Sequence, residues 1–168
     1  TPRTLFPYTT LFRSREQDEH LPLTYPPSFY THLLTLPHSL ALLAYALPSP
    51  LAHPSPLDPA PPLLGTLSAR LLPNPVGPPG IYILSLVVHP SSRRRGVARA
   101  LIRGVVKRLL EGHDQGGRKA WVSLHVQRGN EEAVRLYRRE GLVERGVVRG
   151  YYRGGGGDAV EMGGWVEG

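Results

Sequence analysis

The sequence contains no cysteine, which excludes disulfide bonds, a catalytic thiol and a zinc site built on thiolates. Its most apolar stretch, residues 33–47, is interrupted by Pro37 and His38 and is too short to span a bilayer. The seven histidines show no ligand spacing, and the first residues show no signal-peptide pattern. We therefore expect neither a metal nor a membrane to take part in the function.

The length and charge of the chain suggest one basic domain. Its 168 residues suffice for a single core of ordinary size. Residues 1–14 lack periodicity and an initiator methionine, so they are interpreted as a scar-like or disordered tail before a domain at residues 15–168. The formal net charge of +7 suits an anionic partner, such as a phosphorylated cofactor, an acidic peptide or nucleic acid. Charge alone does not choose among these.

Two short apolar segments, residues 40–47 and 63–72, predict strands. The proline-rich stretch at residues 48–62 separates them and has no apolar period, so it predicts an exposed connection. Upstream, Ser28 is placed to cap a short helix.

Residues 81–88 are apolar on both faces, as expected of a central strand that is covered on each side. A helix should follow, because apolar residues recur at every fourth position from Val97 to Leu109 and Gly112 can end it. Residues 120–126 predict the next strand, with His125 on its more polar face. This strand, helix and strand in close succession predict a right-handed crossover and two parallel, neighbouring strands.

The basic turn at residues 93–98, between the first of these strands and the helix, is a candidate phosphate-binding site. A glycine just inside a helix start allows close approach to the backbone, and the first helical N–H groups point outward. The arginines add positive charge. A basic surface turn that merely precedes a helix is an equally good interpretation of this spacing.

The last third of the chain predicts a capped helix and a hairpin. Asn130 is placed as an N-cap, and Gly141 ends the helix. Residues 142–153 and 159–166 predict the hairpin strands, with the glycine run at residues 154–157 as an exposed loop.

Residues 21–162 resemble the GCN5-related N-acetyltransferase superfamily, and within it the catalytic subunit of NatE-type N-terminal acetyltransferases. The resemblance is carried by separated stretches in a common order: Leu21-Pro22-Leu23 with Tyr25; residues 81–86; Arg-x-x-Gly-x-Ala in the basic turn; Leu124-His125-Val126-Gln127; Asn130-Glu131 with Ala133; Leu136-Tyr137-Arg138; and Tyr151-Tyr152. It implies an α/β (α+β) fold with a mixed central sheet flanked by helices. The family's first strand and part of its first helix are not matched here, which bears on stability more than on the site.

The resemblance implies transfer of acetyl from acetyl-CoA to the α-amine of protein N-termini, chiefly those starting with Met, in the cytoplasm. Such transfer needs a deprotonated amine, a held thioester and a stabilised oxyanion, but no protein nucleophile. An α-amine titrates near 8 and a lysine near 10.4, so presenting the α-amine neutral costs roughly 3 kcal/mol less. A mild base acting through water therefore suffices.

The resemblance also assigns residues to roles. Tyr82 and His125 position and activate the water. Coenzyme A is held by Leu86, Val87, Val88, Arg93, Arg94, Arg95, Gly96, Val97, Ala98, Asn130 and Tyr137. The peptide N-terminus is bracketed by Leu21, Pro22, Leu23, Tyr25, Tyr151 and Tyr152. Several of these residues have a structural alternative: strand packing for Tyr82, a half-exposed strand position for His125, a helix cap for Asn130, half-buried packing for Tyr137, a loop plug over the core for residues 21–25 and a strand-end aromatic pair for Tyr151 and Tyr152.

Two alternative functions stay open. A lysine or small-amine acetyltransferase of the same fold often carries a carboxylate base on the central strand, and residues 81–88 contain none. A catalytically inactive basic module that binds RNA or the ribosome would use the arginines, yet no aromatic stacking platform or RNA motif accompanies them. The resembled subunits also associate with a larger acetyltransferase complex near ribosomes, and no residue here identifies that interface.

Overall fold

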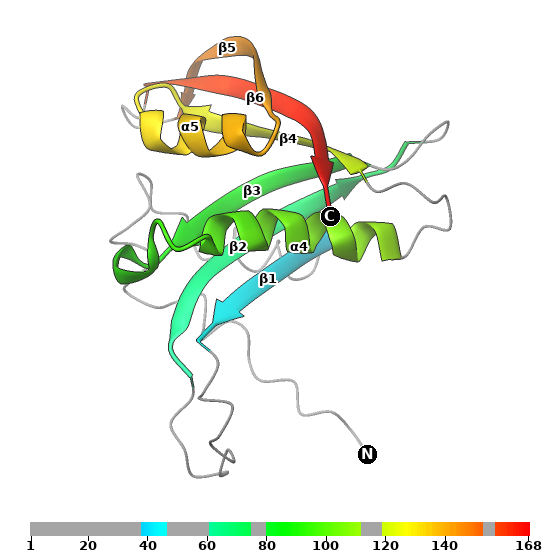
Figure 1. Ribbon diagram of the computed structural model, residues 1–168. Coiled ribbons are helices and arrows are strands. Elements are labelled where there is room, and N and C mark those ends of the chain that lie inside the picture. The colour runs from blue at the N-terminus through cyan, green and yellow to red at the C-terminus, as the bar shows by residue number, and fades with distance from the viewer. Residues whose placement is uncertain (1–37, 47–60, 75–79, 112–118, 153–156) are drawn as a thin grey trace.

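The computed structural model describes residues 38–46, 61–74, 80–111, 119–152 and 157–168 (Figure 1). They form a six-stranded mixed sheet of order β1-β2-β3-β4-β6-β5 with two helices. The elements are β1 (Ser39–Tyr45), β2 (Leu63–Leu72), β3 (Gly80–Val88), the 3-10 turn η1 (Pro90–Ser92), α4 (Val97–Glu111), β4 (Lys119–Gln127), α5 (Glu131–Arg139), β5 (Val143–Tyr152) and β6 (Gly157–Glu167). The predicted mixed sheet flanked by helices is thereby confirmed.

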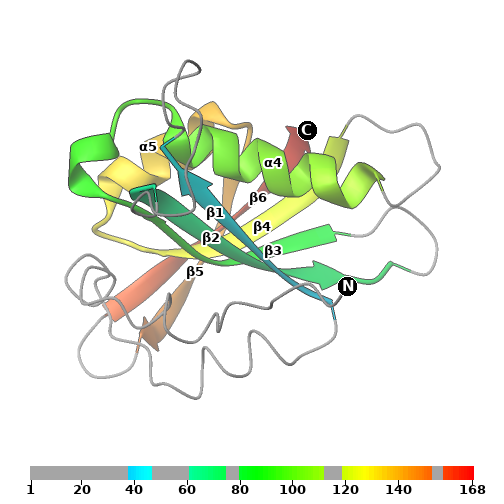
Figure 2. The ribbon, with the colours of Figure 1, turned by 90° about the horizontal axis from the view of Figure 1, so that it is seen from below.

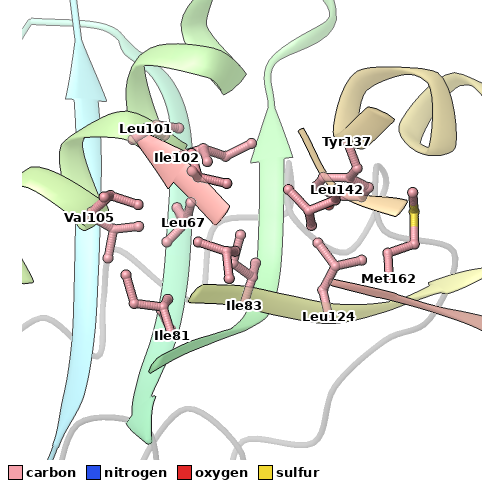
Figure 3. Close-up of a cluster of buried hydrophobic side chains, with 14 of the residues drawn as sticks. Leu67, Ile81, Ile83, Leu101, Ile102, Val105, Leu124, Tyr137, Leu142 and Met162 are labelled. Carbon is pink, nitrogen blue, oxygen red and sulfur yellow. The ribbon is translucent and has the colours of Figure 1, made fainter. Parts of the chain in front are cut away.

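Both helices lie along one face of the sheet (Figure 2). The strands alternate accordingly: on β4, Ala120, Val122, Leu124 and Val126 are buried, while the residues between them are half-buried. Side chains from β2, β3, α4, β4 and β6 meet in one hydrophobic core (Figure 3). Ile81, Ile102 and Met162 have no exposed surface there, and each such side chain contributes about 1.5–3 kcal/mol through burial. None of the helices among the described residues covers the opposite face.

The helix boundaries follow from local signals. Oδ1 of Asn130 accepts a hydrogen bond from the Ala133 N–H at 3.1 Å, which confirms Asn130 as the N-cap of α5. Gly141 follows the helix with φ of +95°, a left-handed conformation that favours glycine at a helix end. The start of α4 at Val97 is also confirmed, whereas the predicted stop at Gly112 lies outside the described residues.

The predicted strand pairing is confirmed at the centre of the sheet. β3 and β4 are parallel neighbours, and β5 and β6 form an antiparallel hairpin. The chain returns so that β6, not β5, pairs with β4, which makes β5 an edge strand among the strands described. The expectation that β3 is covered on both faces is wrong. Ile81 and Ile83, which share the face toward the helices, are buried, whereas Tyr82 on the opposite face and residues 84–88 are half-buried.

Candidate active site

β3 and β4 pair only over their first residues and then separate. The pairing runs from Gly80 with Trp121 to Ile83 with Leu124, although β3 continues to Val88 and β4 to Gln127 (Figure 1). Within the described residues, the edge of β3 at residues 84–88 therefore has no strand partner on the side of β4. Such an edge presents backbone N–H and C=O groups that an amide-containing ligand can pair with.

Tyr82 and His125 meet where the two strands begin to separate. The Tyr82 hydroxyl lies 2.7 Å from Nδ1 of His125, within hydrogen-bond distance. Because Tyr82 is in register with Ser123, His125 is two residues farther along β4 and on the same face. This face is the one that the described helices leave uncovered.

Two tyrosines of β5 complete a cluster with this pair. The Tyr151 hydroxyl lies 3.1 Å from that of Tyr82, and the Tyr151 ring stacks on His125 with centroids 4.5 Å apart and planes 7° from parallel. The Tyr152 hydroxyl donates to the backbone C=O of His125 at 3.3 Å. We call Tyr82, His125, Tyr151 and Tyr152 the tyrosine–histidine cluster. It brings together a central strand, its parallel neighbour and the edge strand.

The basic turn has the geometry of an anion site. Arg94 and Gly96 have φ of +60° and +83°, and a Cβ on Gly96 would meet no atom within 4 Å. Immediately afterwards α4 begins, with no acidic side chain in its first turn. The first helical N–H groups lack intrahelical acceptors and carry the positive end of the helix dipole.

Two arginines of the turn, Arg93 and Arg94, contact neighbouring elements. Nε of Arg93 donates to the C=O of Val88 at 3.3 Å, which ties the turn to the end of β3. Arg94 forms a long contact of 3.8 Å with Glu132 of α5, and both side chains are well exposed. An exposed pair of this kind is weak and can yield to an anionic ligand.

Of the remaining predicted site residues, two have structural roles and four lie outside the described residues. Asn130 acts as a helix cap, and Tyr137 is 7% exposed within the core, which is more buried than the half-buried packing given as its structural alternative. Leu21, Pro22, Leu23 and Tyr25 lie outside the described residues. Among the described residues, no group of three or more His, Asp or Glu side chains could hold a metal ion, and no helix could cross a membrane.

Sequence reasoning missed one residue on the same face. Glu161 of β6 is directly opposite His125 in the antiparallel pair and is exposed. Its signal was available, since it is the one acidic residue in the otherwise apolar segment 159–166. Only the pairing of β6 with β4 shows that it lies beside the cluster.

This fold, with a sheet that separates beside a basic helix start, is matched by a known family. The acetyltransferase (GNAT) family profile matches residues 16–142, well over half of the chain. The chain therefore belongs to the acetyltransferase (GNAT) family, and it is an acetyltransferase that uses acetyl-CoA.

Solved structures with the same fold cover most of the chain. NAA60 of Arabidopsis thaliana, solved with a bisubstrate analogue, is 24% identical with a TM-score of 0.71, covering 98% of each chain. Arabidopsis thaliana Naa50, solved with the bisubstrate analogue CoA-Ac-MVNAL, is 19% identical with a TM-score of 0.68, covering 95% of this chain and 93% of that one. A chimera of the spermidine N-acetyltransferase SpeG from Vibrio cholerae is 19% identical with a TM-score of 0.54, covering 84% and 74%. At these identities the similarity shows the fold alone.

Proposed function

We propose that this acetyltransferase acts on the α-amine of peptide N-termini, chiefly those that begin with methionine. The observation that carries the proposal is the contact between Tyr82 and His125 where β3 and β4 separate, on a central strand that offers no carboxylate. Neutral and weakly basic groups suit an acceptor amine that is already close to deprotonation. An α-amine, which titrates near 8, meets this condition better than a lysine near 10.4.

In this proposal Tyr82 and His125 are the catalytic residues. His125 accepts the proton of the incoming ammonium through a water held by both side chains, leaving a neutral amine with a free lone pair. The stacked ring of Tyr151 fixes the plane of the imidazole, and the Tyr152 hydroxyl fixes the backbone of the same residue. A base held at this geometry contributes about 10²–10⁴-fold to the rate.

The residues of the separated edge and of the basic turn fit coenzyme A. When bound, acetyl-CoA supplies an acetyl group activated as a thioester. Backbone groups of Leu86, Val87 and Val88 on the open edge of β3 would pair with the amides of its pantetheine arm. The N–H groups of Gly96, Val97 and Ala98, together with Arg93, Arg94 and Arg95, would hold its pyrophosphate. The open space around Gly96 leaves room for that group.

The acceptor would approach over the uncovered face of the sheet, where Tyr151 and Tyr152 stand beside the cluster. The apolar residues Leu21, Pro22 and Leu23, with Tyr25, are proposed to receive its first side chain. The structure of Arabidopsis Naa50, which has the same fold, was solved with the bisubstrate analogue CoA-Ac-MVNAL, and this supports an acceptor that starts with Met.

Steady-state kinetics with three acceptors test the proposal. We expect kcat/KM for a Met-starting peptide to exceed that for an N-terminally blocked peptide with one internal lysine by about 100-fold or more at neutral pH, since the fraction of neutral amine differs by that order. Spermidine should be a similarly poor acceptor. Faster acetylation of the lysine peptide or of spermidine would refute the proposal in favour of a lysine or small-amine acetyltransferase.

A further inference from the structure

We propose that Glu161 is a specificity-determining residue that selects acceptors with a positively charged side chain at the second or third position. The inference rests on the proposed function and refines its substrate class. It starts from the pairing of β4 with β6, which sets Glu161 directly opposite His125. Side chains of directly opposed residues share a face and have Cβ atoms about 4.5–5.5 Å apart.

Among the acidic residues that the structure describes, Glu161 differs in having no ion-pair partner in the described part of the chain. Each other acidic side chain of the described residues has at least one arginine or lysine within ion-pair distance: Glu111, Glu131, Glu132, Glu140, Glu144, Asp158 and Glu167. Over the same part of the chain, the Glu161 carboxylate makes no ion pair and no hydrogen bond, although the protein has a formal charge of +7. Within the described residues, no cationic side chain therefore lies within ion-pair distance of its negative charge beside the active site.

The neighbours of Glu161 leave room for a ligand. On β5 its partner is Gly146, where a Cβ would meet nothing within 4 Å. Along β6 the adjacent positions on the same face are Ala159 and Gly163. On the Gly163 side the Trp121 ring packs against the glycine, so the open sides of the carboxylate are those of Gly146 and Ala159.

The strand order separates Glu161 from the reacting amine. Tyr82, His125 and Glu161 lie on successive strands, β3, β4 and β6, with neighbouring strands about 4.8 Å apart. Glu161 is therefore one strand beyond His125 on the side away from Tyr82. A carboxylate that held the amine itself would favour the ammonium form and oppose the reaction. A cationic side chain at a later position of the acceptor can pair with the Glu161 carboxylate without stabilising the ammonium form of the reacting amine.

The test compares peptides that differ only in charge. The peptides start with Met and carry Lys, Gln or Glu at position two or at position three. We expect the unaltered protein to prefer a Lys peptide over its Gln counterpart in kcat/KM. This preference should fall about two- to fivefold in Glu161→Gln, the range of an exposed ion pair. In Glu161→Lys the order should reverse in favour of the Glu peptide. The preference should also weaken as salt is raised.

Glu167→Gln is the matched control, because Glu167 is an exposed glutamate on the same face of β6, about 20 Å from Glu161. It should leave the preference unchanged. A Lys-to-Gln ratio that stays constant in Glu161→Gln, or an equal fall for every peptide, would overturn the inference while leaving the proposed function intact. If the unaltered protein acetylates none of the peptide N-termini but does acetylate the blocked lysine peptide or spermidine, the proposed function fails and the inference fails with it.

Discussion

The Tyr82 hydroxyl lies 2.7 Å from Nδ1 of His125, although 43 residues separate the two in sequence. The contact exists because β3 and β4 are parallel and in register up to Ile83 and Leu124, just before His125. It links the central strand to the strand beside it on the open face, and the first prediction concerns it.

Tyr82→Phe removes the hydroxyl that contacts both His125 and Tyr151 while keeping the ring. We expect kcat to fall about 100-fold, the lower range for loss of general acid–base assistance, with unchanged affinity for acetyl-CoA in calorimetric titration. Tyr45→Phe on β1 is the control and should keep full activity. A Tyr82→Phe enzyme with kcat within about twofold of the unaltered protein would contradict a catalytic role for this hydroxyl.

A second prediction separates the ring of Tyr151 from its hydroxyl. Tyr151→Phe keeps the stack on His125 and should lower kcat by about three- to tenfold, the range of one hydrogen bond. Tyr151→Ala also removes the stack, so we expect a further fall in kcat and a higher KM for the peptide. Equal kinetics for the two variants in the same assay would show that the stack does not orient the imidazole.

The third prediction concerns the basic turn and is measured by calorimetric titration with acetyl-CoA. Gly96→Trp should lower the affinity at least tenfold, because the indole would fill the space left open at this position. Gly96→Ala is the control, since it shares the strain of a side chain at φ of +83° but adds only one carbon. Arg94→Ala, which removes a charge, should also weaken binding.

If Gly96→Trp binds acetyl-CoA with the same affinity as the unaltered protein, the basic turn is not the site that holds the cofactor. If Gly96→Ala loses as much affinity as Gly96→Trp, then backbone strain, and not the filled space, is the cause. Circular dichroism of each variant separates either result from unfolding.

A fourth prediction is about stability, and it concerns the ion pairs between the two helices. The Glu140 side chain is only 4% exposed, and its two oxygens lie 3.3 Å from Nε of Arg99 and 3.3 Å from Nε of Arg103. Glu140→Gln should lower the free energy of unfolding by about 1–3 kcal/mol. This is less than for a fully buried pair, because both arginines are partly exposed. Urea denaturation measures it.

Glu131→Gln provides the comparison, because Glu131 pairs with Arg135 on the surface of α5, the helix that Glu140 follows as its C-cap residue. It should cost less than about 0.5 kcal/mol. If the Glu140→Gln protein is as stable as the Glu131→Gln protein, water solvates Arg99 and Arg103 as well as the Glu140 carboxylate does.

Much of the fold could be predicted because its signals are local. The bounds of β2, the start of α4, the Asn130 cap and the end of α5 before Gly141 all follow from the residues themselves and their nearest neighbours. The parallel pairing of β3 and β4 also followed, because a strand, helix and strand in short succession have one favoured hand. These predictions placed Tyr82 and His125 on neighbouring strands.

Other features depend on contacts across the sheet and could not be read locally. Nothing in residues 142–167 states that β6 enters the sheet between β4 and β5, so neither the stack of Tyr151 on His125 nor the position of Glu161 could be predicted. The point at which β3 and β4 separate could not be predicted either, because the apolar pattern of β3 continues beyond Ile83, the last residue that pairs with β4.

The sequence by itself determined the secondary structure, the family and the residue types available for chemistry, because periodicity, caps and motifs are properties of short stretches of chain. Only the tertiary structure decided which of these residues meet. Strand order and register are set by the packing of the whole sheet against α4 and α5, and a shift of one residue in register would turn His125 and Glu161 toward the core.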